Sequence, residues 1–183
     1  MSRIAAVDPA SANTQAKPLL DAVNANFGVT PNLFRVAAQS PTTLEGLLGL
    51  NGALAKGQLD AKMRGAIALA VAETNESNYC LSAHSALGVG AGLSEGEMSS
   101  ARKAEANDPK TAAVLRFARA VAETRGRVSD SQLAQVRQAG ANDGEVVEIV
   151  GNVVLHIFTN YLNSVAGTEI DFPVVQAGVA KAA

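Results

Sequence analysis

The chain has 183 residues, a mass of 18.7 kDa and a formal net charge of −2. This charge balance excludes a strongly basic nucleic-acid or membrane-surface protein, and a 48% share of hydrophobic residues excludes a disordered chain. Alanine accounts for 35 residues, whereas aromatic residues make up only 4% of the chain. Because alanine favours helices and is depleted in strands, the composition predicts an all-α fold.

The sequence shows no membrane span and no secretion signal. Its longest strongly apolar stretch, 66–72, is far shorter than the roughly 20 residues that a bilayer span needs. Residues 1–5 do not lead into the apolar run of a signal peptide. A single cysteine cannot form an intramolecular disulfide, which fits a reducing compartment. We therefore expect a cytoplasmic protein that binds neither nucleic acid nor a membrane.

Helix start and stop signals divide the first half of the chain into an arm and four helices. Residues 1–15 carry no helical period and predict an N-terminal arm. The predicted helices cover about 16–26, a short segment after Thr30-Pro31, about 41–56, and a segment that begins after the capping residue Asp60. Asn75 is the candidate for a left-handed residue that ends the fourth helix.

Capping side chains predict five more helices in the second half. Ser77 caps a helix that ends near residue 89, and Asp108-Pro109 opens one that ends near 124. The other three begin with capping boxes: Ser94 with Glu97, Ser129 with Gln132, and Asn142 with Glu145, the last helix reaching about 163.

We expect these eight or nine helices to form a single domain over residues 16–175. No interior segment is rich enough in Pro, Gly or Ser to act as a linker, and none alternates as a strand would. Residues 176–183 predict a flexible C-terminal tail. The fourth and ninth helices are both apolar, and we expect them to form a central antiparallel pair.

The reactive residues concentrate between positions 73 and 84. Cys80 and His84 are four apart in the predicted fifth helix, so they share one helix face. A neighbouring histidine and a helix N-terminus, here capped by Ser77, both favour the nucleophilic thiolate. Glu73 ends the preceding helix and is the candidate that orients His84. Together these residues would form a Cys-His-carboxylate site.

A structural role is the alternative for each of them. A lone cysteine on an alanine-rich helix is commonly a small buried hydrophobe, and Ser77 would then serve only as a cap. One cysteine and two histidines do not make a multi-ligand metal set, so we expect no metal.

A polar stripe marks the ninth predicted helix. Asn152, His156, Asn160 and Asn163 follow one another at spacings of four, four and three, on one face of an otherwise apolar helix. Buried polar side chains need hydrogen-bond partners. The active-site helix, a loop backbone or a neighbouring subunit could supply them, and a structural role is favoured.

The segment Ser77-x-x-Cys80-x-x-x-His84 resembles the Cys-x-x-Cys-x-x-x-His motif of the carboxymuconolactone decarboxylase family, in its alkylhydroperoxidase AhpD-like branch. Segments 28–34, 158–163 and 168–173 are also similar to this branch. The likeness covers roughly residues 17–175. It implies an all-helical fold that assembles as homo-trimers or homo-hexamers, and a thiol peroxidase or dithiol-disulfide oxidoreductase activity that needs no cofactor.

The resemblance also assigns roles and reveals two departures. It implies that Cys80 is the thiol that reacts with peroxide and that His84 belongs to its proton relay. The resolving cysteine of the branch is replaced by Ser77, so an internal disulfide cannot form. The proton-relay glutamate of the branch falls at Gly65, and Glu73 is the substitute that we prefer over Glu148.

The sequence therefore predicts a hydroperoxide reductase that uses Cys80 and an external thiol or dithiol. Two alternatives stay open. One is the family's decarboxylation of a carboxylated lactone, with His84 as general acid–base and Arg64 as the only nearby cation. The other is a non-enzymatic, stress-related oligomeric scaffold.

Overall fold

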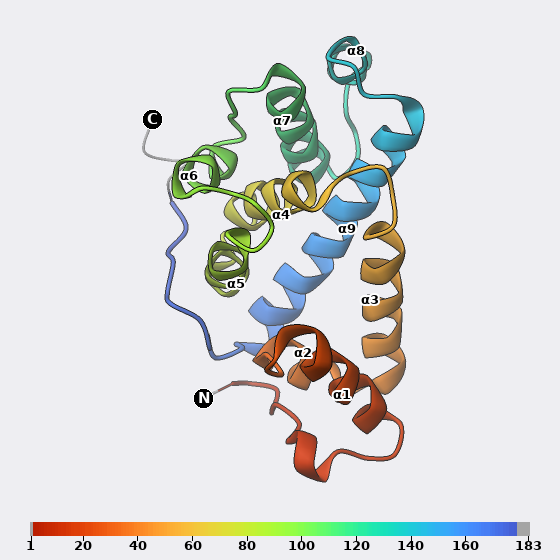
Figure 1. Ribbon diagram of the computed structural model, residues 1–183, viewed down its shortest axis with the longest axis vertical. Helices are drawn as coiled ribbons and strands as arrows, with labels where there is room; N and C mark the ends of the chain where they lie inside the picture. The colour runs from red at the N-terminus through yellow and green to blue at the C-terminus, as the bar shows by residue number, and fades with distance from the viewer. Residues whose placement is uncertain (1, 179–183) are drawn as a thin grey trace.

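The computed structural model describes residues 2–178 and is drawn in Figure 1. Within them lie nine α-helices, one short 3-10 helix and no strand, which confirms the predicted all-α fold. The elements are the 3-10 helix Pro9–Ser11 and the α-helices α1 (Ala16–Phe27), α2 (Asn32–Ala37), α3 (Pro41–Leu54), α4 (Ala61–Thr74), α5 (Asn78–Gly88), α6 (Glu95–Arg102), α7 (Pro109–Thr124), α8 (Asp130–Gln138) and α9 (Asp143–Ala166). None of the helices in this part of the chain combines the length and hydropathy needed to cross a bilayer.

The predicted caps are formed as expected in the second half of the chain. Ser77 and Asp108 accept hydrogen bonds from the third backbone N–H of α5 and α7. The capping boxes that open α6, α8 and α9 are all complete, with both reciprocal bonds present. Because these interactions involve side chains within three residues of the helix start, local sequence was enough to predict them.

The end of α4 corrects one prediction. Asn75 has a φ of −91°, and the left-handed residue is Glu76, with a φ of 53°. The N–H of Ser77 reaches back to the carbonyl of Ala72, which is the six-to-one bond of a Schellman motif and requires the left-handed residue one position later. The displaced Asn75 instead directs its side chain to Asn160 of α9.

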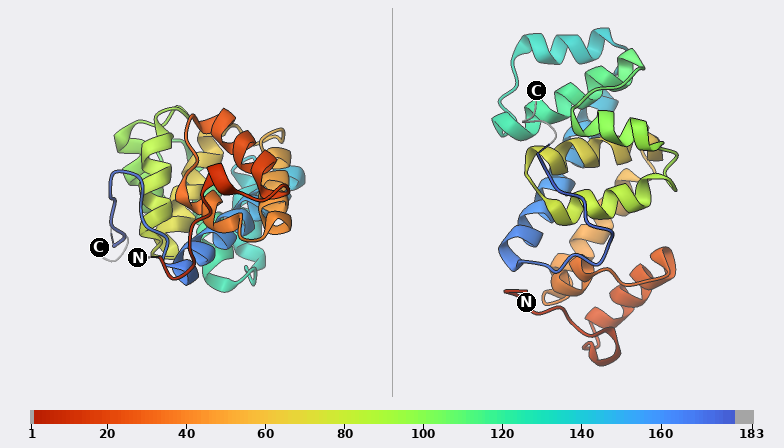
Figure 2. Two further views of the ribbon diagram at one scale, coloured as in Figure 1. Left: turned by 90° about the horizontal axis from the view of Figure 1, so that it is seen from below. Right: turned by 90° about the vertical axis from the view of Figure 1, so that its left-hand side faces the viewer.

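The main core is built around α4. Eight consecutive residues of this helix, 66–73, are buried, because α5, α6, α7 and α9 all pack against it. A helix that is apolar on every side belongs inside such a core, and its alanines allow the neighbouring helices to approach closely. The contact between α4 and α9 is as expected, but the two helices cross steeply in Figures 1 and 2 and do not form an antiparallel pair.

A second, smaller apolar cluster joins α1, α2 and α3 to the far side of α9. Leu20, Leu44 and Leu155 belong to it, whereas Ile149 and Val153 of α9 belong to the main core. Helix α9 therefore contributes to both clusters and lies between them (Figure 1). Cavities in helical proteins form preferentially between helices, and a cavity of about 110 Å³ lies at this junction.

Both ends of the described chain are tied down. The backbone N–H groups of Arg3 and Ile4 donate to the carbonyl of Ala166 at the end of α9. After α9 the chain runs back along α5 towards α6, as the right-hand view of Figure 2 shows. Residues 176–178, part of the predicted flexible tail, are hydrogen-bonded to side chains of α4, α5 and α6. The rest of that predicted tail, 179–183, lies outside the described residues.

Candidate functional site

Cys80 occupies the third position of α5, in its first turn. The hydroxyl oxygen of Ser77 accepts a bond from the backbone N–H of Cys80 at 3.5 Å, so the helix start is fixed directly beside the thiol. Cys80 is only 2% exposed, yet it lines the cavity at the junction of the two apolar clusters. At this position the helix dipole favours negative charge on the sulfur. The predicted positions of Ser77 as the cap of this helix and of Cys80 in its first turn are therefore confirmed.

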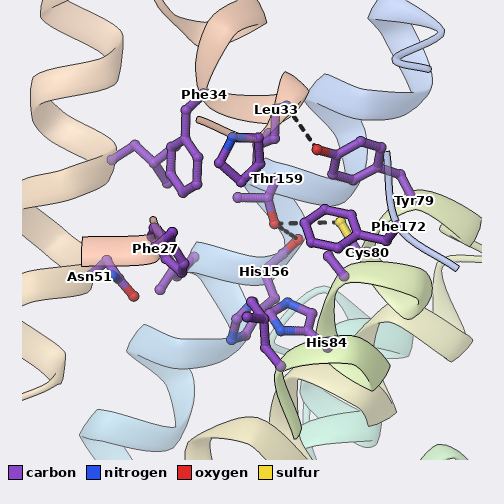
Figure 3. Close-up of a pocket in the computed structure, with 15 residues that line it drawn as sticks. Phe27, Leu33, Phe34, Asn51, Tyr79, Cys80, His84, His156, Thr159 and Phe172 are labelled. Atoms are coloured by element: carbon purple, nitrogen blue, oxygen red, sulfur yellow. Dashed lines mark hydrogen bonds between the residues drawn. The ribbon is translucent and has the colours of Figure 1, made fainter. Parts of the chain in front are cut away.

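Two side chains of α9 meet the sulfur of Cys80. The amide nitrogen Nδ2 of Asn163 donates to Sγ at 3.4 Å. The hydroxyl oxygen of Thr159 lies 3.9 Å from Sγ and donates its own proton to the carbonyl of His156 at 3.0 Å. Since that proton is already engaged, the Thr159 oxygen accepts the thiol proton. The sulfur thus has one acceptor and one donor within the protein, as Figure 3 shows in part.

His84 lies one turn beyond Cys80 and faces a second histidine. Its imidazole ring meets that of His156 edge to face, with ring centroids 5.0 Å apart and an interplanar angle of 90°. Burial in apolar surroundings lowers the pKa of His84 to about 4, although part of the ring surface reaches the cavity. Burial, together with charge on His84, also lowers the pKa of His156. Both imidazoles are therefore neutral at pH 7.

The cavity beside Cys80 is small and apolar. Its volume is about 110 Å³, and no charged side chain lines it among the described residues. The lining comes from α1, α2, α3, α5, α9 and the segment after α9: Phe27, Pro31, Leu33, Phe34, Leu47, Asn51, Tyr79, Cys80, Ala83, His84, Leu87, Leu155, His156, Thr159 and Phe172 (Figure 3). A dry apolar cavity of roughly 150 Å³ holds a benzene-sized molecule, so this one suits a compact neutral ligand.

Tyr79 fixes one wall of this cavity. Its hydroxyl donates to the carboxylate of Asp171 at 2.8 Å and accepts from the backbone N–H of Leu33 at 2.9 Å. The ring of Phe172 packs edge on against Tyr79, with centroids 5.9 Å apart. Burial raises the pKa of Tyr79, so its phenol keeps the proton that it donates. The segment after α9 is in this way held across the start of α5 and the start of α2.

Glu73 does not make the contact that the sequence suggested. Its side chain is 1% exposed and forms an ion pair with Arg102 of α6, with a distance of 2.9 Å between Oε2 and Nε. Its other oxygen accepts from the N–H of Gly178. Neither bond leads to His84, and burial alone accounts for the lowered pKa of that histidine. The described contacts of Glu73 therefore hold the C-terminal segment against α6 and do not orient the imidazole.

The other charged candidates also lie elsewhere. Glu148 accepts bonds from the N–H groups of Gln58 and Leu59 and so caps the turn before α4. Arg64 donates to the carbonyl of Leu59 and does not line the cavity. At Gly65 an added Cβ would lie 3.2 Å from the Leu93 side chain, which is likewise outside the cavity lining. The described residues also contain no cluster of three or more ligating side chains suited to a metal ion.

The polar stripe of α9 faces inward, and its members have different partners. Asn152 donates to the carbonyl of Glu148 in its own helix, and Asn160 accepts from the side chain of Asn75. His156 and Asn163 instead reach the face of α5 that carries Cys80. The suggestion that the active-site helix supplies a hydrogen-bond partner is thus confirmed for Asn163, whereas His156 meets that helix through a ring contact.

Sequence reasoning missed several parts of this site. Thr159 lies three residues after His156 and four before Asn163, so the helical period itself could have placed it on the stripe. The aromatic wall of Phe27, Phe34 and Phe172 had no such signal. These rings come from segments that are distant in sequence and meet only because α1, α2 and the segment after α9 pack around one junction.

Comparison with known proteins agrees with this architecture. The sequence profile of the Carboxymuconolactone decarboxylase family matches residues 41–124, which confirms the predicted resemblance. No curated protein matches the chain in sequence.

Several solved structures share the fold. One is an alkylhydroperoxidase AhpD core, an uncharacterized peroxidase-related protein from Ralstonia eutropha JMP134, with a TM-score of 0.79 and 22% identity over 93% of this chain and 92% of that chain. A peroxidase-related protein from Silicibacter sp. TM1040 has a TM-score of 0.79 and 19% identity, over 91% and 88%. The debrominase Bmp8, solved with 2,3,4-tribromopyrrole, has a TM-score of 0.79 and 17% identity, over 92% and 91%. At these identities the likeness establishes the fold alone.

Proposed function

We propose that this chain, whose residues 41–124 match the carboxymuconolactone decarboxylase family, reduces organic hydroperoxides with the thiol of Cys80. One observation carries the proposal: Cys80 lies at a helix N-terminus, lines an apolar cavity, and shares it with two neutral imidazoles. A nucleophilic thiol needs donors that favour its thiolate and a group that can carry its proton. The start of α5 meets the first of these requirements, and the imidazoles that line the same cavity meet the second.

The cavity suggests which peroxides would fit. Its aromatic and aliphatic lining offers no charged partner, so it would favour a neutral peroxide with a compact apolar group over a charged one. The volume of about 110 Å³ is smaller than the roughly 150 Å³ that holds benzene, so it limits that group to a short or branched alkyl chain. We therefore assign the substrate class as compact, neutral alkyl hydroperoxides.

The chemical step balances without a cofactor. The sulfur of Cys80 attacks the outer oxygen of ROOH, an S–O bond forms and the O–O bond breaks. The thiol proton, which points to the Thr159 hydroxyl in the resting protein, is transferred to the neutral imidazole of His84, next to His156, and from there to the departing alkoxide, which leaves as ROH. Cys80 is thereby oxidised to a sulfenic acid, and the peroxide is reduced to an alcohol.

Regeneration of Cys80 requires a thiol from outside the chain. Ser77 stands where a resolving cysteine would be, and its hydroxyl cannot form a disulfide. An external thiol would condense with the sulfenic acid to a mixed disulfide and release water. A second external thiol, or the other sulfur of a dithiol, would then reduce that disulfide. Such thiols are plentiful in a reducing compartment, so we assign the protein to the cytoplasm.

The rival functions have less support. A lactone acid carries a carboxylate, and the cavity offers no cation to bind it because Arg64 is engaged elsewhere. A purely structural scaffold would not need a thiol, two imidazoles and a hydrophobic cavity in one place. Replacing Cys80 by Ser separates these possibilities, since only the peroxidase would lose its activity outright.

We also propose that the protein is a homo-oligomer, a trimer or hexamer by analogy with its family. The surface that would support this is the outer face of α9, an apolar stripe along almost the whole helix. It consists of Val147, Val150, Val154, Phe158, Tyr161 and Val165, all of them exposed. A contiguous apolar stripe of this length is typical of an interface, and the matching face of a second copy is the occupant that we assign.

The test of the proposed function uses the position of the missing cysteine. Residues 77 and 80 are neighbours on one helix turn, so Ser77→Cys should give a disulfide that tert-butyl hydroperoxide forms and dithiothreitol removes. Losing the Ser77 cap should cost only about 1 kcal/mol of stability. In the absence of reductant the unaltered protein should consume about one peroxide per Cys80, and Cys80→Ser should consume none. A Ser77→Cys protein that forms no disulfide and consumes no peroxide would contradict the proposal.

A further inference from the structure

We propose that Asn163 is a catalytic residue, the hydrogen-bond donor that favours the thiolate of Cys80 over its thiol. The inference rests on the thiol chemistry proposed above. Asn163 lies in the last turns of α9, and its Nδ2 donates to the Cys80 sulfur at 3.4 Å. The side chain is 4% exposed, so water does not compete for this donor. Thr159 is the other side chain that bonds the sulfur, and it acts as an acceptor, so among the described residues the amide is the side-chain donor to the sulfur.

The energetics of this position argue against a purely structural role. A neutral thiol is a weak acceptor, and the other end of the amide, Oδ1, has no partner among the described residues. An unsatisfied buried carbonyl lowers stability, whereas an apolar side chain of similar size would avoid that loss. Asn163 therefore keeps a buried oxygen without a compensating bond among the described residues while it points a donor at the Cys80 sulfur. This arrangement is expected where a polar group serves a charged state of its partner.

The hydroxyl of Thr159 determines which groups donate and which accept in the hydrogen bonds at the Cys80 sulfur. Thr159 donates to the carbonyl of His156, so its oxygen accepts the proton of the Cys80 thiol. The lone pairs of the sulfur then remain for the N–H of Asn163. When the thiol proton leaves, the Asn163 donor still points at the sulfur, and its bond becomes charge-assisted and stronger. The amide therefore stabilises the thiolate more than it stabilises the thiol.

Comparison with the rest of the stripe makes Asn163 specific. Asn152 is as deeply buried on the same helix, but it donates only to a carbonyl of its own helix. Asn160 accepts from Asn75 at the end of α4, and its own Nδ2 also has no partner among the described residues, so an unpartnered atom alone does not distinguish Asn163. Of the three buried amides, Asn163 alone contacts Cys80. Asn152 therefore provides a matched control for any substitution at position 163.

The test is the rate of Cys80 alkylation by iodoacetamide as a function of pH, which involves no peroxide. Asn163→Leu removes the donor at similar volume. We expect the pH midpoint of alkylation to rise by about one unit and the rate at pH 7 to fall about tenfold. Asn152→Leu should leave the profile unchanged. An Asn163→Leu profile that matches the unaltered protein, or an equal shift in Asn152→Leu, would overturn the inference.

Two further measurements keep the outcome clear. If Asn163→Leu does not fold, Asn163→Asp replaces it, because this variant keeps the shape, loses the donor and adds a repelling charge. The pH midpoint of Cys80 alkylation should then rise further than in Asn163→Leu. An unmoved midpoint in Asn163→Asp would overturn the inference. In the unaltered protein the side-chain amide resonances of Asn163 should move as Cys80 ionises and stay fixed in Cys80→Ser. Resonances that do not move also overturn it. Because alkylation is independent of peroxide, a failure of the peroxidase proposal would leave the alkylation result readable.

Discussion

The imidazole rings of His84 and His156 meet edge to face, with centroids 5.0 Å apart. They are the only two histidines of the chain, and α5 and α9 bring them together beside the reactive thiol. Burial lowers the pKa of both, and a charge on His84 lowers that of His156 further. The pair is neutral at pH 7 and can carry a single transferred proton more readily than two.

The buried histidine pair makes stability depend on pH. The unfolded chain protonates its histidines near pH 6.5, whereas folded His84 stays neutral down to about pH 4. Between these values the unfolded state binds more protons than the folded state. The contribution of the neutral histidines to the unfolding free energy is therefore fully present above pH 6.5 and is lost as the pH is lowered towards 4. By pH 5 the loss from His84 alone should be on the order of 2 kcal/mol. Urea unfolding at pH 7, 6 and 5 measures it, before most carboxylates titrate.

The variant His156→Gln tests whether the histidines cause this dependence of the unfolding free energy on pH. It removes one of the two titrating groups, so the fall in unfolding free energy between pH 6.5 and pH 5 should be about half that of the unaltered protein. His84→Gln should give a similar result. Identical slopes in all three proteins would mean that the histidines do not control acid stability.

Tyr79→Phe should loosen the cavity wall. The phenol is the partner of both the Leu33 N–H and the Asp171 carboxylate, and the change leaves these groups without that bond. We expect a loss of about 1–3 kcal/mol in unfolding free energy. The matched control is Tyr161→Phe, because Tyr161 is the only other tyrosine and is 58% exposed. Equal stabilities for the two variants would show that the Tyr79 hydroxyl bonds contribute nothing.

Glu73→Gln separates the two roles considered for this carboxylate. Its ion pair with Arg102 is largely buried, so loss of the charge should lower stability by about 3 kcal/mol. The pH profile of Cys80 alkylation should stay unchanged if Glu73 only anchors the C-terminal segment. A shifted profile would instead support the sequence-based expectation that Glu73 belongs to the proton relay. Glu123→Gln, at an exposed position on α7, serves as the control.

The proposed self-association through α9 can be tested with a single charge. Val154 lies in the middle of the outer face of α9 and is 52% exposed. Val154→Lys should lower the sedimentation coefficient to that of a smaller species without altering the circular dichroism spectrum, because a buried unpaired charge disfavours the interface. Val174→Lys, outside this helix, should sediment like the unaltered protein. A monomer before any substitution would refute the assembly itself.

Local chemistry explains what the sequence could predict. The Ser77 cap, the capping boxes and the spacing of Cys80 and His84 all depend on residues within one helix turn, so their placement follows from the chain order alone. The partner of Glu73 depends instead on where α6 and the C-terminal segment pack. A residue at the end of one helix can face several neighbours, and the sequence contains no signal that favours Arg102 over His84.

The polar stripe of α9 also shows which features follow from local sequence and which depend on packing. Helical spacing predicted that Asn152, His156, Asn160 and Asn163 share one face, and they do. Which of them would meet the thiol depends on the steep crossing of α9 over the helices of the main core. That geometry follows from side-chain packing over the whole molecule, so the contact between Asn163 and Cys80 became visible only in three dimensions.

The most direct test of the central claim is a single turnover followed at Cys80. The protein is mixed with one equivalent of tert-butyl hydroperoxide in the presence of dimedone, which traps sulfenic acids, and residue 80 is examined by mass spectrometry. Our account predicts that the peroxide disappears and that Cys80 carries the dimedone adduct, with neither event in Cys80→Ser. Unmodified Cys80 beside unconsumed peroxide would contradict it.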